Sequence, residues 1–107
     1  MKKSDGQGGI SMLVLALLRN EEMYGYRIIT ELERRSEGYF RMKEGSLYPV
    51  LHGLERDKLV RAREELSDSG RKRRYYRITD KGLQALETQE RAFQEYAEAV
   101  TAILQGT

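Results

Sequence analysis

The stretch KEGSLYPVLHGLERDKLV, from Lys43 to Val60, carries the strongest structural signal in this chain of 107 residues. Its apolar side chains recur at positions i, i+3, i+4 and i+7, the spacing that places residues on one face of a helix. These side chains are Leu47, Val50, Leu51 and Leu54. The rest of the helix offers Ser46, Tyr48, Pro49, His52 and Arg56. We therefore expect the apolar stripe to pack on a domain. The mixed face either contacts a partner or is the polar face of an ordinary amphipathic helix.

Pro49 bears on where this helix begins, because proline is tolerated in the first turn of a helix but disfavoured in its interior. The sequence therefore favours a regular helix that begins near Ser46 rather than at Glu44. Ser46 would then be the N-cap, where free backbone amides can meet a phosphate. The alternative is that Ser46 caps the helix and has no further role.

Two helices are predicted before this one. Residues 1–9, MKKSDGQGG, are polar and rich in glycine and predict a flexible leader. From Ile10 to about Arg19, apolar residues are dense enough for a helix that is buried on most sides. A second helix is expected from about Tyr24 to Arg35, before the connector SEGYFRM. Gly25 costs a helix roughly 1 kcal/mol relative to alanine, so we expect a neighbouring helix to approach it closely.

After the third helix the pattern changes to that of strands. The segments LVRAREEL and KRRYYRI are strand-like, and SDSG between them supplies turn residues, so a β-hairpin is predicted. Alternation along the second strand places Arg74, Tyr76 and Ile78 on one face. The other face would carry Arg73, Tyr75 and Arg77.

A long helix is predicted from about Asp80 to Leu104, with Thr79 as its N-cap and Asp80 placed favourably against the helix dipole. Its residues at alternating steps of three and four form a heptad seam with one polar member. The seam consists of Leu83, Leu86, Glu90, Phe93, Ala97, Val100 and Leu104.

This order of elements predicts the fold class. Three helices, a basic hairpin and a long helix make a mostly α chain with a small β-hairpin wing, that is, a winged helix-turn-helix plus a C-terminal dimerisation helix. The predicted domains are the flexible leader 1–9, a winged helix-turn-helix DNA-binding domain 10–78 and the dimerisation helix 79–107.

The charge is unevenly distributed, although the net charge is only +2. Residues 56–77 carry 9 basic and 4 acidic side chains, whereas residues 78–107 carry 2 basic and 5 acidic ones. Within the basic segment, GRKRRYYR combines five cations with two tyrosines just after a turn, which suits a wing that lies along a phosphate backbone. The alternative is a basic strand that only faces solvent.

Several classes of function lack their residues in this sequence. The chain has no cysteine and a single histidine, His52, so a histidine-based catalytic or metal site has little to build on. No glycine-rich phosphate loop and no G-x-S-x-G motif occur. We predict a protein that is not an enzyme, with no cofactor and no metal.

The sequence also predicts no membrane segment. The longest apolar run, ISMLVLALL, is about half of the roughly 20 residues that a bilayer requires. Together with the absence of cysteine, this favours the cytoplasm.

The last helix is too apolar along one stripe for a single 12.4 kDa domain to cover it easily. An exposed seam of this kind is an association site, and proteins that read a duplex commonly pair two recognition helices across a dyad, so a homodimer is predicted. The alternative is packing against the first helix, and both can hold together. The candidate interface residues are Leu13, Leu17, Leu86, Phe93, Tyr96, Ala97, Val100, Ile103 and Leu104.

Several motifs, in their order and spacing, resemble the PadR family of bacterial transcription regulators, in its short-tailed branch with a single C-terminal helix. They are LVLALL, YGYRI, KEGSLYPVLHGLERDKLV, SGRKRRYYRITDKG and the terminal helix, and the resemblance covers roughly residues 10–104. It implies a winged-helix dimer that represses promoters, often its own, at a palindromic operator. It also implies release of the DNA when a small molecule or phenolic compound binds.

Specific residues of this chain match the DNA-contacting positions of the family. Three lie on the recognition helix, three at the wing tip and two at helix starts, and Arg56 adds a cation on the outer face of the helix. The candidate DNA-binding residues are Tyr24, Lys43, Ser46, Tyr48, His52, Arg56, Arg71, Lys72 and Arg73.

Two positions depart from the family pattern. Lys58 stands where the family usually has a glycine that ends the helix in a left-handed conformation. A lysine in that conformation would cost about 1 kcal/mol, or the helix would need a different cap. Phe93 stands where many relatives carry a tryptophan that stacks on planar drugs. A flat aromatic effector is therefore not expected, and Phe93 and Tyr96 are the candidate lining of a smaller effector pocket.

Three other interpretations remain open at the level of the sequence. The chain could be a protein-interaction module that docks a partner through the C-terminal seam without binding DNA, which predicts a complex insensitive to salt. It could be an RNA-binding winged helix, which competition with single-stranded RNA would reveal. A MarR-type regulator is the third, but such proteins usually place helices on both sides of the winged domain in a longer chain.

Overall fold

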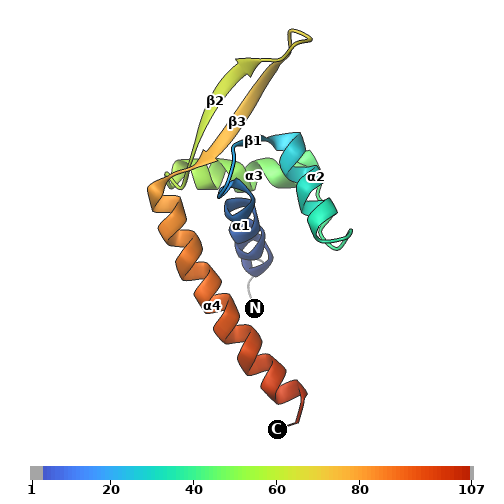
Figure 1. The fold of residues 1–107 in the computed structure, drawn as a ribbon, viewed down its shortest axis with the longest axis vertical. Helices are drawn as coiled ribbons and strands as arrows, with labels where there is room; N and C mark the ends of the chain where they lie inside the picture. Colours follow the sequence, from blue (N-terminus) through green and yellow to red (C-terminus); the bar gives the residue numbers. More distant parts are fainter. Residues whose placement is uncertain (1–3, 107) are drawn as a thin grey trace.

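The computed structural model describes residues 4–106, with side chains described from Gly9 onwards. Three helices form a compact body, a hairpin projects from it, and a long helix leaves the other side (Figure 1). The predicted fold class, a mostly α winged helix-turn-helix with a further C-terminal helix, is confirmed. The elements are α1 (Ser4–Leu18), β1 (Met23–Tyr24), α2 (Gly25–Arg35), α3 (Glu44–Arg56), β2 (Val60–Leu66), β3 (Lys72–Ile78) and α4 (Asp80–Leu104).

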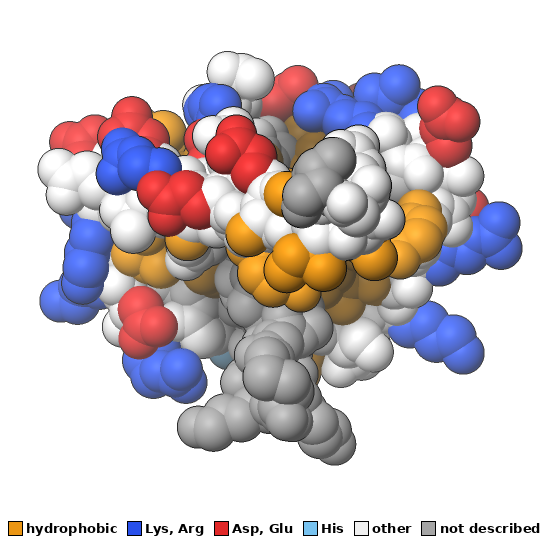
Figure 2. Space-filling view, turned by 90° about the horizontal axis from the view of Figure 1, so that it is seen from below, with side chains coloured by type: hydrophobic (Ala, Val, Ile, Leu, Met, Phe, Trp, Pro, Cys, Tyr) orange, Lys and Arg blue, Asp and Glu red, His pale blue; other side chains and the backbone are white. Residues whose placement is uncertain are grey.

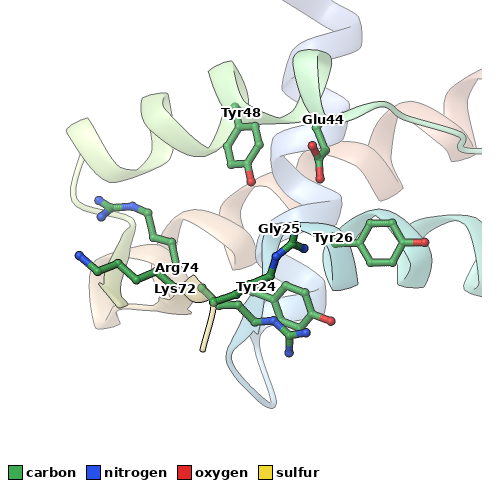
Figure 3. A pocket seen from close by; sticks show the side chains of 9 residues that line it. Tyr24, Gly25, Tyr26, Glu44, Tyr48, Lys72 and Arg74 are labelled. Carbon is green, nitrogen blue, oxygen red and sulfur yellow. The ribbon is translucent and has the colours of Figure 1, made fainter. Parts of the chain in front are cut away.

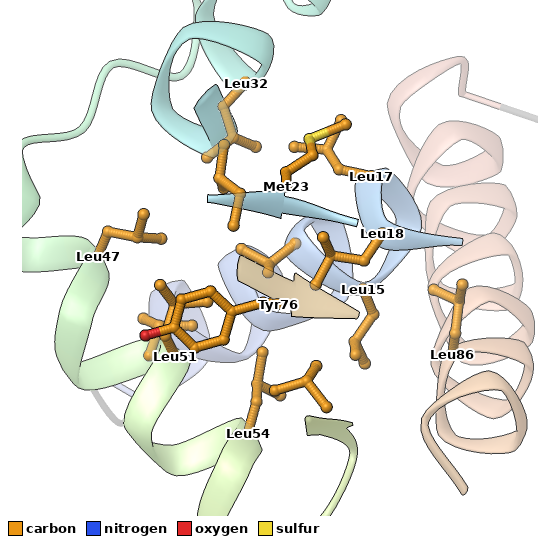
Figure 4. Close-up of a cluster of buried hydrophobic side chains, with 14 residues drawn as sticks. Leu15, Leu17, Leu18, Met23, Leu32, Leu47, Leu51, Leu54, Tyr76 and Leu86 are labelled. Atoms are coloured by element: carbon orange, nitrogen blue, oxygen red, sulfur yellow. The ribbon is translucent and has the colours of Figure 1, made fainter. Parts of the chain in front are cut away.

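The core lies where α1, α2 and α3 meet the base of the sheet (Figure 4). The apolar stripe of α3 is buried there, as its spacing predicted. Tyr76 from β3 and Leu15 from α1 are fully buried in the same cluster. Leu86 adds the first turns of α4 to this core, because only 1% of its surface is exposed.

The sheet is antiparallel with strand order β1-β3-β2. The predicted hairpin pairs Val60 with Ile78 and Leu66 with Lys72, and it turns at Gly70, whose φ of 85° favours glycine. The sequence did not predict β1, which pairs Met23 with Tyr76. Two residues are too short to show an alternating pattern, and their partner lies far along the chain.

The long helix α4 begins as predicted. The Thr79 hydroxyl accepts a hydrogen bond from the Gly82 amide at 3.0 Å and donates one to the Lys58 carbonyl at 2.8 Å. Gly82 lies so close to the chain before β2 that a Cβ atom there would be 2.1 Å from the Leu59 carbonyl oxygen. The far half of α4 extends beyond the body, and the molecule measures 58 × 29 × 26 Å (Figure 1).

Two predicted helix starts are wrong. Helix α1 begins at Ser4 rather than Ile10, so the predicted flexible leader is helical over Ser4–Gly9, and residues 1–3 lie outside the described residues. Extending an existing helix adds a hydrogen bond for each residue, which offsets the poor helix propensity of its glycines.

Helix α3 begins at Glu44 with Lys43 as its N-cap, so Ser46 is its third residue and not the cap. Pro49 consequently lies inside the helix. The missing bond is tolerated because Pro49 and Gly45, whose carbonyl would have accepted it, are both exposed to solvent.

Lys58 adopts the left-handed conformation that the family pattern implied, with φ of 64°. The Leu59 amide donates to the Leu54 carbonyl at 2.9 Å and the Lys58 amide to the Glu55 carbonyl at 3.0 Å. These two bonds form a Schellman motif, so α3 ends with a normal cap despite the lysine.

Candidate nucleic-acid interface

The outer face of α3 is open to solvent. Ser46, His52 and Arg56 are exposed along it, while the opposite face is buried in the core. Lys43 is exposed immediately before the first turn. The helix therefore presents short hydrogen-bonding groups and cations to the outside, the combination that recognition helices use on bases and phosphates.

Tyr48 has a structural role as well. A Cβ atom on Gly25 would lie 3.1 Å from the Tyr48 hydroxyl oxygen, so Gly25 leaves room for this ring where α3 crosses the start of α2. The close approach predicted at Gly25 thus comes from a side chain and not from a helix backbone. The ring centroids of Tyr48 and His52 lie 6.2 Å apart on α3.

Two tyrosine rings lie between two guanidinium groups across the sheet. The Arg73 guanidinium lies over the Tyr24 ring at 4.4 Å, and the Tyr24 ring meets that of Tyr75 edge-on at 5.5 Å. On the far side of Tyr75, Arg63 lies 5.0 Å from the ring centroid. This stack joins β1, β3 and β2 and fixes Arg73 beside the start of α2.

Arg63 is neutralised by carboxylates. Its guanidinium forms ion pairs with Glu22 and Glu65. The hydrogen bond from Arg63 holds the pKa of Glu22 below its ordinary value, and the bonds to Glu22 and Glu65 raise the pKa of Arg63. Arg63 therefore stabilises the wing more than it adds positive charge to the surface.

Arg74 links the wing to α3. Its guanidinium lies 2.7 Å from a Glu55 carboxylate oxygen, and this bond raises the pKa of Arg74. The same guanidinium lies 5.9 Å from the centroid of the Tyr76 ring. Burial raises the pKa of the Tyr76 hydroxyl, which finds no hydrogen-bond partner among the described residues.

A cavity of about 700 Å³ opens between the first turn of α3, the start of α2 and the wing. Figure 3 shows tyrosines on two sides and the wing cations along a third. Such a cavity offers positive charge and aromatic surface to a phosphate backbone. It is lined by Tyr24, Gly25, Tyr26, Glu44, Tyr48, Arg71, Lys72, Arg73 and Arg74.

The structure brings together five of the nine predicted DNA-binding residues in this cavity, namely Tyr24, Tyr48, Arg71, Lys72 and Arg73. Ser46 and His52 lie outward on α3 and Lys43 precedes it. Arg56 is not brought to the cavity, because it lies in the last turn of α3, where its guanidinium is 3.7 Å from Asp57.

Four lining residues were not among the predicted DNA-binding residues, namely Gly25, Tyr26, Glu44 and Arg74. Strand alternation assigns Arg74 to the face of Tyr76, and a helix start at Ser46 would have left Glu44 outside the helix. Tyr26 lies in the motif YGYRI, but no local pattern in the sequence places its ring against the wing.

The nine candidate dimer residues differ in exposure, and three of them, Leu13, Ala97 and Val100, are half-buried. Leu86 and Leu17 are buried within the chain itself, so Leu86 in particular has no surface left for a partner. Phe93 and Leu104 are 55% and 80% exposed, and Tyr96 and Ile103 are also open. The polar member of the seam, Glu90, lies 3.3 Å from Arg19 at the end of α1.

The described residues contain no group of three or more histidine, cysteine, aspartate or glutamate side chains that could hold a metal ion. Within the described part of the chain, no helix combines the length and hydropathy that a membrane crossing requires.

Comparison with known proteins matches residues 14–88 to the transcriptional regulator PadR-like family. The transcriptional regulator Rv3488 of Mycobacterium tuberculosis is 35% identical over 94 residues, which cover 88% of this chain and 84% of that protein. A PadR-like transcriptional regulator structure from Bacillus cereus is 35% identical, with a TM-score of 0.80 over 94% of this chain and 95% of that one. A PadR family structure from Eggerthella lenta is 31% identical, with a TM-score of 0.82 over 94% and 85%.

The family and these relatives are transcriptional regulators, which confirms the prediction that the chain is not an enzyme. The match covers α2, α3, the wing and the first turns of α4, the elements that build the cavity and its flanks. This chain is a transcriptional regulator and belongs to the PadR-like family.

Proposed function

We propose that the protein is a homodimeric repressor that binds double-stranded DNA at a palindromic promoter operator and is released by a small-molecule effector. The observation that carries this proposal is the shared surface of α3 and the wing. Glu44 in the first turn of α3 and Lys72 of the wing lie on different sides of one cavity (Figure 3). Arg71 and Arg73 also line this cavity.

This arrangement would let α3 contact bases while the wing contacts phosphates. With the exposed face of α3 in the major groove, Ser46 and His52 would meet base edges. Arg71 and Arg73 form no ion pair with any described residue, so their charge is available to phosphates. Lys72 is held only loosely, with its ammonium nitrogen 3.9 Å from Glu64.

The dimer is supported by apolar surface that a single chain leaves open. Figure 2 views the molecule from the end where α4 terminates and shows apolar side chains gathered near that end, with charged ones around them. A groove of about 350 Å³ between α1, α2 and the following loop is lined largely by apolar residues, including Leu13, Leu17 and Phe40. The α4 helix of a second copy, with its exposed aromatic and aliphatic residues, is a fitting occupant.

The effector site is proposed on α4, where the two copies of the dimer would meet. Phe93 and Tyr96 are both open on α4 of the single chain, where two copies meeting along α4 would enclose them. A small molecule held there would alter how the two α4 helices cross, and with them the separation of the two recognition helices. Because that separation must match about one turn of DNA, an effector can release the operator from a distance.

The test is a fluorescence-anisotropy titration of a labelled duplex from upstream of the gene, beside a scrambled duplex, at 50 and 200 mM salt. Light scattering measures the mass in parallel. We expect a dimer that prefers the upstream duplex and that loses roughly a thousand-fold or more in affinity at the higher salt if six or more phosphates are contacted. Equal, weak binding to both duplexes would contradict sequence-specific recognition at that site.

A protein-docking module is the second candidate, because the exposed apolar face of α4 fits a different chain as well as a second copy. It predicts that the protein binds no duplex even at 50 mM salt, and that neutralising Arg71 and Arg73 leaves the complex with the partner unchanged.

A further inference from the structure

Glu44 is the one acidic residue among the described residues that line the basic cavity. It is the first residue of α3, and its side chain is exposed. Figure 3 shows its carboxylate directed from α3 into the cavity, on the side facing the start of α2. A negative charge at this place works against phosphate binding, so its presence calls for a specific explanation.

Three other carboxylates near the wing are paired with cations. Glu55 lies 2.7 Å from Arg74, Glu22 pairs with Arg63, and Glu64 lies 3.9 Å from Lys72. Glu44 differs, because in the described part of the chain no Lys or Arg nitrogen comes within 4.0 Å of its carboxylate. Its oxygens are therefore free to accept hydrogen bonds from a ligand.

A carboxylate at this position has a well-defined complement in a duplex. The first residues of a recognition helix reach the base edges of the major groove, where the amino group of cytosine is the donor that acidic side chains accept from. Guanine and thymine present only acceptors at the corresponding atoms and would face the carboxylate without a hydrogen bond. Adenine does have an amino donor, but its N7 acceptor lies beside that donor and disfavours a carboxylate relative to cytosine. Rejection of the wrong base then adds to the preference for the right one.

We propose that Glu44 is a specificity-determining residue of the DNA interface, which accepts a hydrogen bond from the amino group of a cytosine and repels phosphates of unselected DNA. This inference rests on the proposed function. The ordinary role of an acidic residue in the first turn, favourable interaction with the helix dipole, does not require the carboxylate to point into the cavity.

Two substitutions separate these roles. Glu44→Gln removes the charge and offers a donor and an acceptor, the pattern that adenine matches. Glu44→Asp keeps the charge in the first turn of the helix but withdraws it by one methylene from the groove. Glu87→Gln is the matched control, because Glu87 is an exposed carboxylate of α4 outside the cavity and without an ion pair among the described residues.

The experiment is selection from a random duplex library with each full-length variant, followed by anisotropy titration on the selected duplex, a version altered at the cytosine, and a random duplex. We expect the wild-type protein to enrich a cytosine at one position in each half-site. Glu44→Gln should shift that position alone towards adenine, tighten binding to random DNA and lower the ratio of specific to random affinity roughly ten-fold. Glu44→Asp should lose the cytosine preference, and Glu87→Gln should behave like the wild type.

Three results would overturn the inference. If Glu44→Gln tightens selected and random duplexes equally, the carboxylate only repels phosphate. If it lowers the melting temperature and leaves every base preference intact, Glu44 only stabilises the end of α3. If the wild-type protein enriches no sequence at all, the proposed function itself fails, a result that does not depend on the Glu44 variants.

Discussion

The guanidinium of Arg74 on β3 lies 2.7 Å from the carboxylate of Glu55 on α3. One ion pair thus connects the wing directly to the helix whose outer face is open. The two side chains are 42% and 34% exposed, so the pair is a surface contact whose effect on stability is small. We interpret it as a contact that positions the wing.

Replacing Glu55 distinguishes a role in positioning the wing from a role in stabilising the fold. Glu55→Gln should lower the free energy of unfolding by less than about 1 kcal/mol in urea titrations, because the pair is largely solvated. It should nevertheless weaken binding to the selected duplex, because the wing is no longer held against α3. Glu64→Gln is the control, since Glu64 forms its ion pairs within the wing, 4.0 Å from Arg74 and 3.9 Å from Lys72. Equal effects of the two variants on DNA affinity would rule out a positioning role for Glu55.

Substitutions on the wing and on α3 should have different consequences. Arg73→Ala removes a cation that lies over Tyr24 beside the cavity, and it should weaken binding to every duplex alike and reduce the salt dependence. His52→Ala or Ser46→Ala should instead change which sequence is preferred. Titrations of selected and random duplexes measure both effects. If both classes of variant change the affinities for the two duplexes equally, α3 and the wing do not have these separate roles.

Substituting alanine for Gly82 and for Gly53 should change the stability of the protein in opposite directions. Gly82→Ala would place a Cβ atom 2.1 Å from the Leu59 carbonyl oxygen and 2.7 Å from Ile78 Cγ1, so we expect a loss of about 3 kcal/mol in the free energy of unfolding. At Gly53→Ala the nearest side-chain atom is Arg56 Nη2, at 3.5 Å, so this variant should stabilise the protein by about 0.5–1 kcal/mol. Urea unfolding of the two variants checks both values. A neutral Gly82→Ala would mean that α4 does not pack against Leu59 as described.

The left-handed lysine offers a route to greater stability. Lys58→Gly should raise the free energy of unfolding by about 1 kcal/mol, because φ of 64° strains a residue with a side chain but suits glycine. Asp57→Gly, one residue earlier at φ of −84°, should not stabilise the protein. Thermal unfolding of the two variants gives the comparison, and a gain at Asp57 instead of Lys58 would place the helix end differently.

The contacts of Glu31 with two arginines predict that the stability of the fold depends on pH. Hydrogen bonds from Arg34 and Arg35 lower the pKa of Glu31 from 4.5 to about 2. Because the folded-state pKa is depressed, its stabilising contribution is complete above pH 4.5 and is lost as the pH falls towards 2. Wild-type protein should therefore exceed Glu31→Gln in stability at pH 6, and the difference should vanish near pH 2. An NMR titration of Glu31 with a midpoint near 4.5 would contradict the geometry of these bonds.

Much of the fold follows from local patterns in the sequence. The stripe from Leu47 to Leu54 and the hairpin with its turn at Gly70 appear where their periodicity places them. The start of α4 at Thr79 follows from a capping hydroxyl. These features depend on neighbours in the chain, so the sequence specifies them directly.

Other features depend on contacts between distant residues. The strand β1 exists because Met23 and Tyr24 pair with β3, and no local pattern announces it. The start of α3 at Glu44 contradicts the usual preference of Pro49 for a first turn, since exposed neighbours leave the freed carbonyl in solvent. That error of two residues also hid Glu44 as a lining residue of the cavity.

The candidate site also combines features that are evident in the local sequence with features that depend on distant contacts. The basic character of the wing is evident from GRKRRYYR, but the sequence cannot tell that Arg74 is engaged with Glu55 while Arg71 and Arg73 remain available. Nor can it tell that the cavity forms at the first turn of α3, away from Arg56 in the last turn. Both facts follow from the crossing of α3 and the wing in three dimensions.

The most direct test of the account is an amide NMR spectrum of the full-length protein recorded while the selected duplex is added. If α3 and the wing form the DNA interface, shifts should concentrate at residues 24–26, 43–52 and 71–74, with the far half of α4 little affected. Shifts confined to α4, or none at saturating duplex, would contradict the claim that this regulator reads DNA through α3 and the wing.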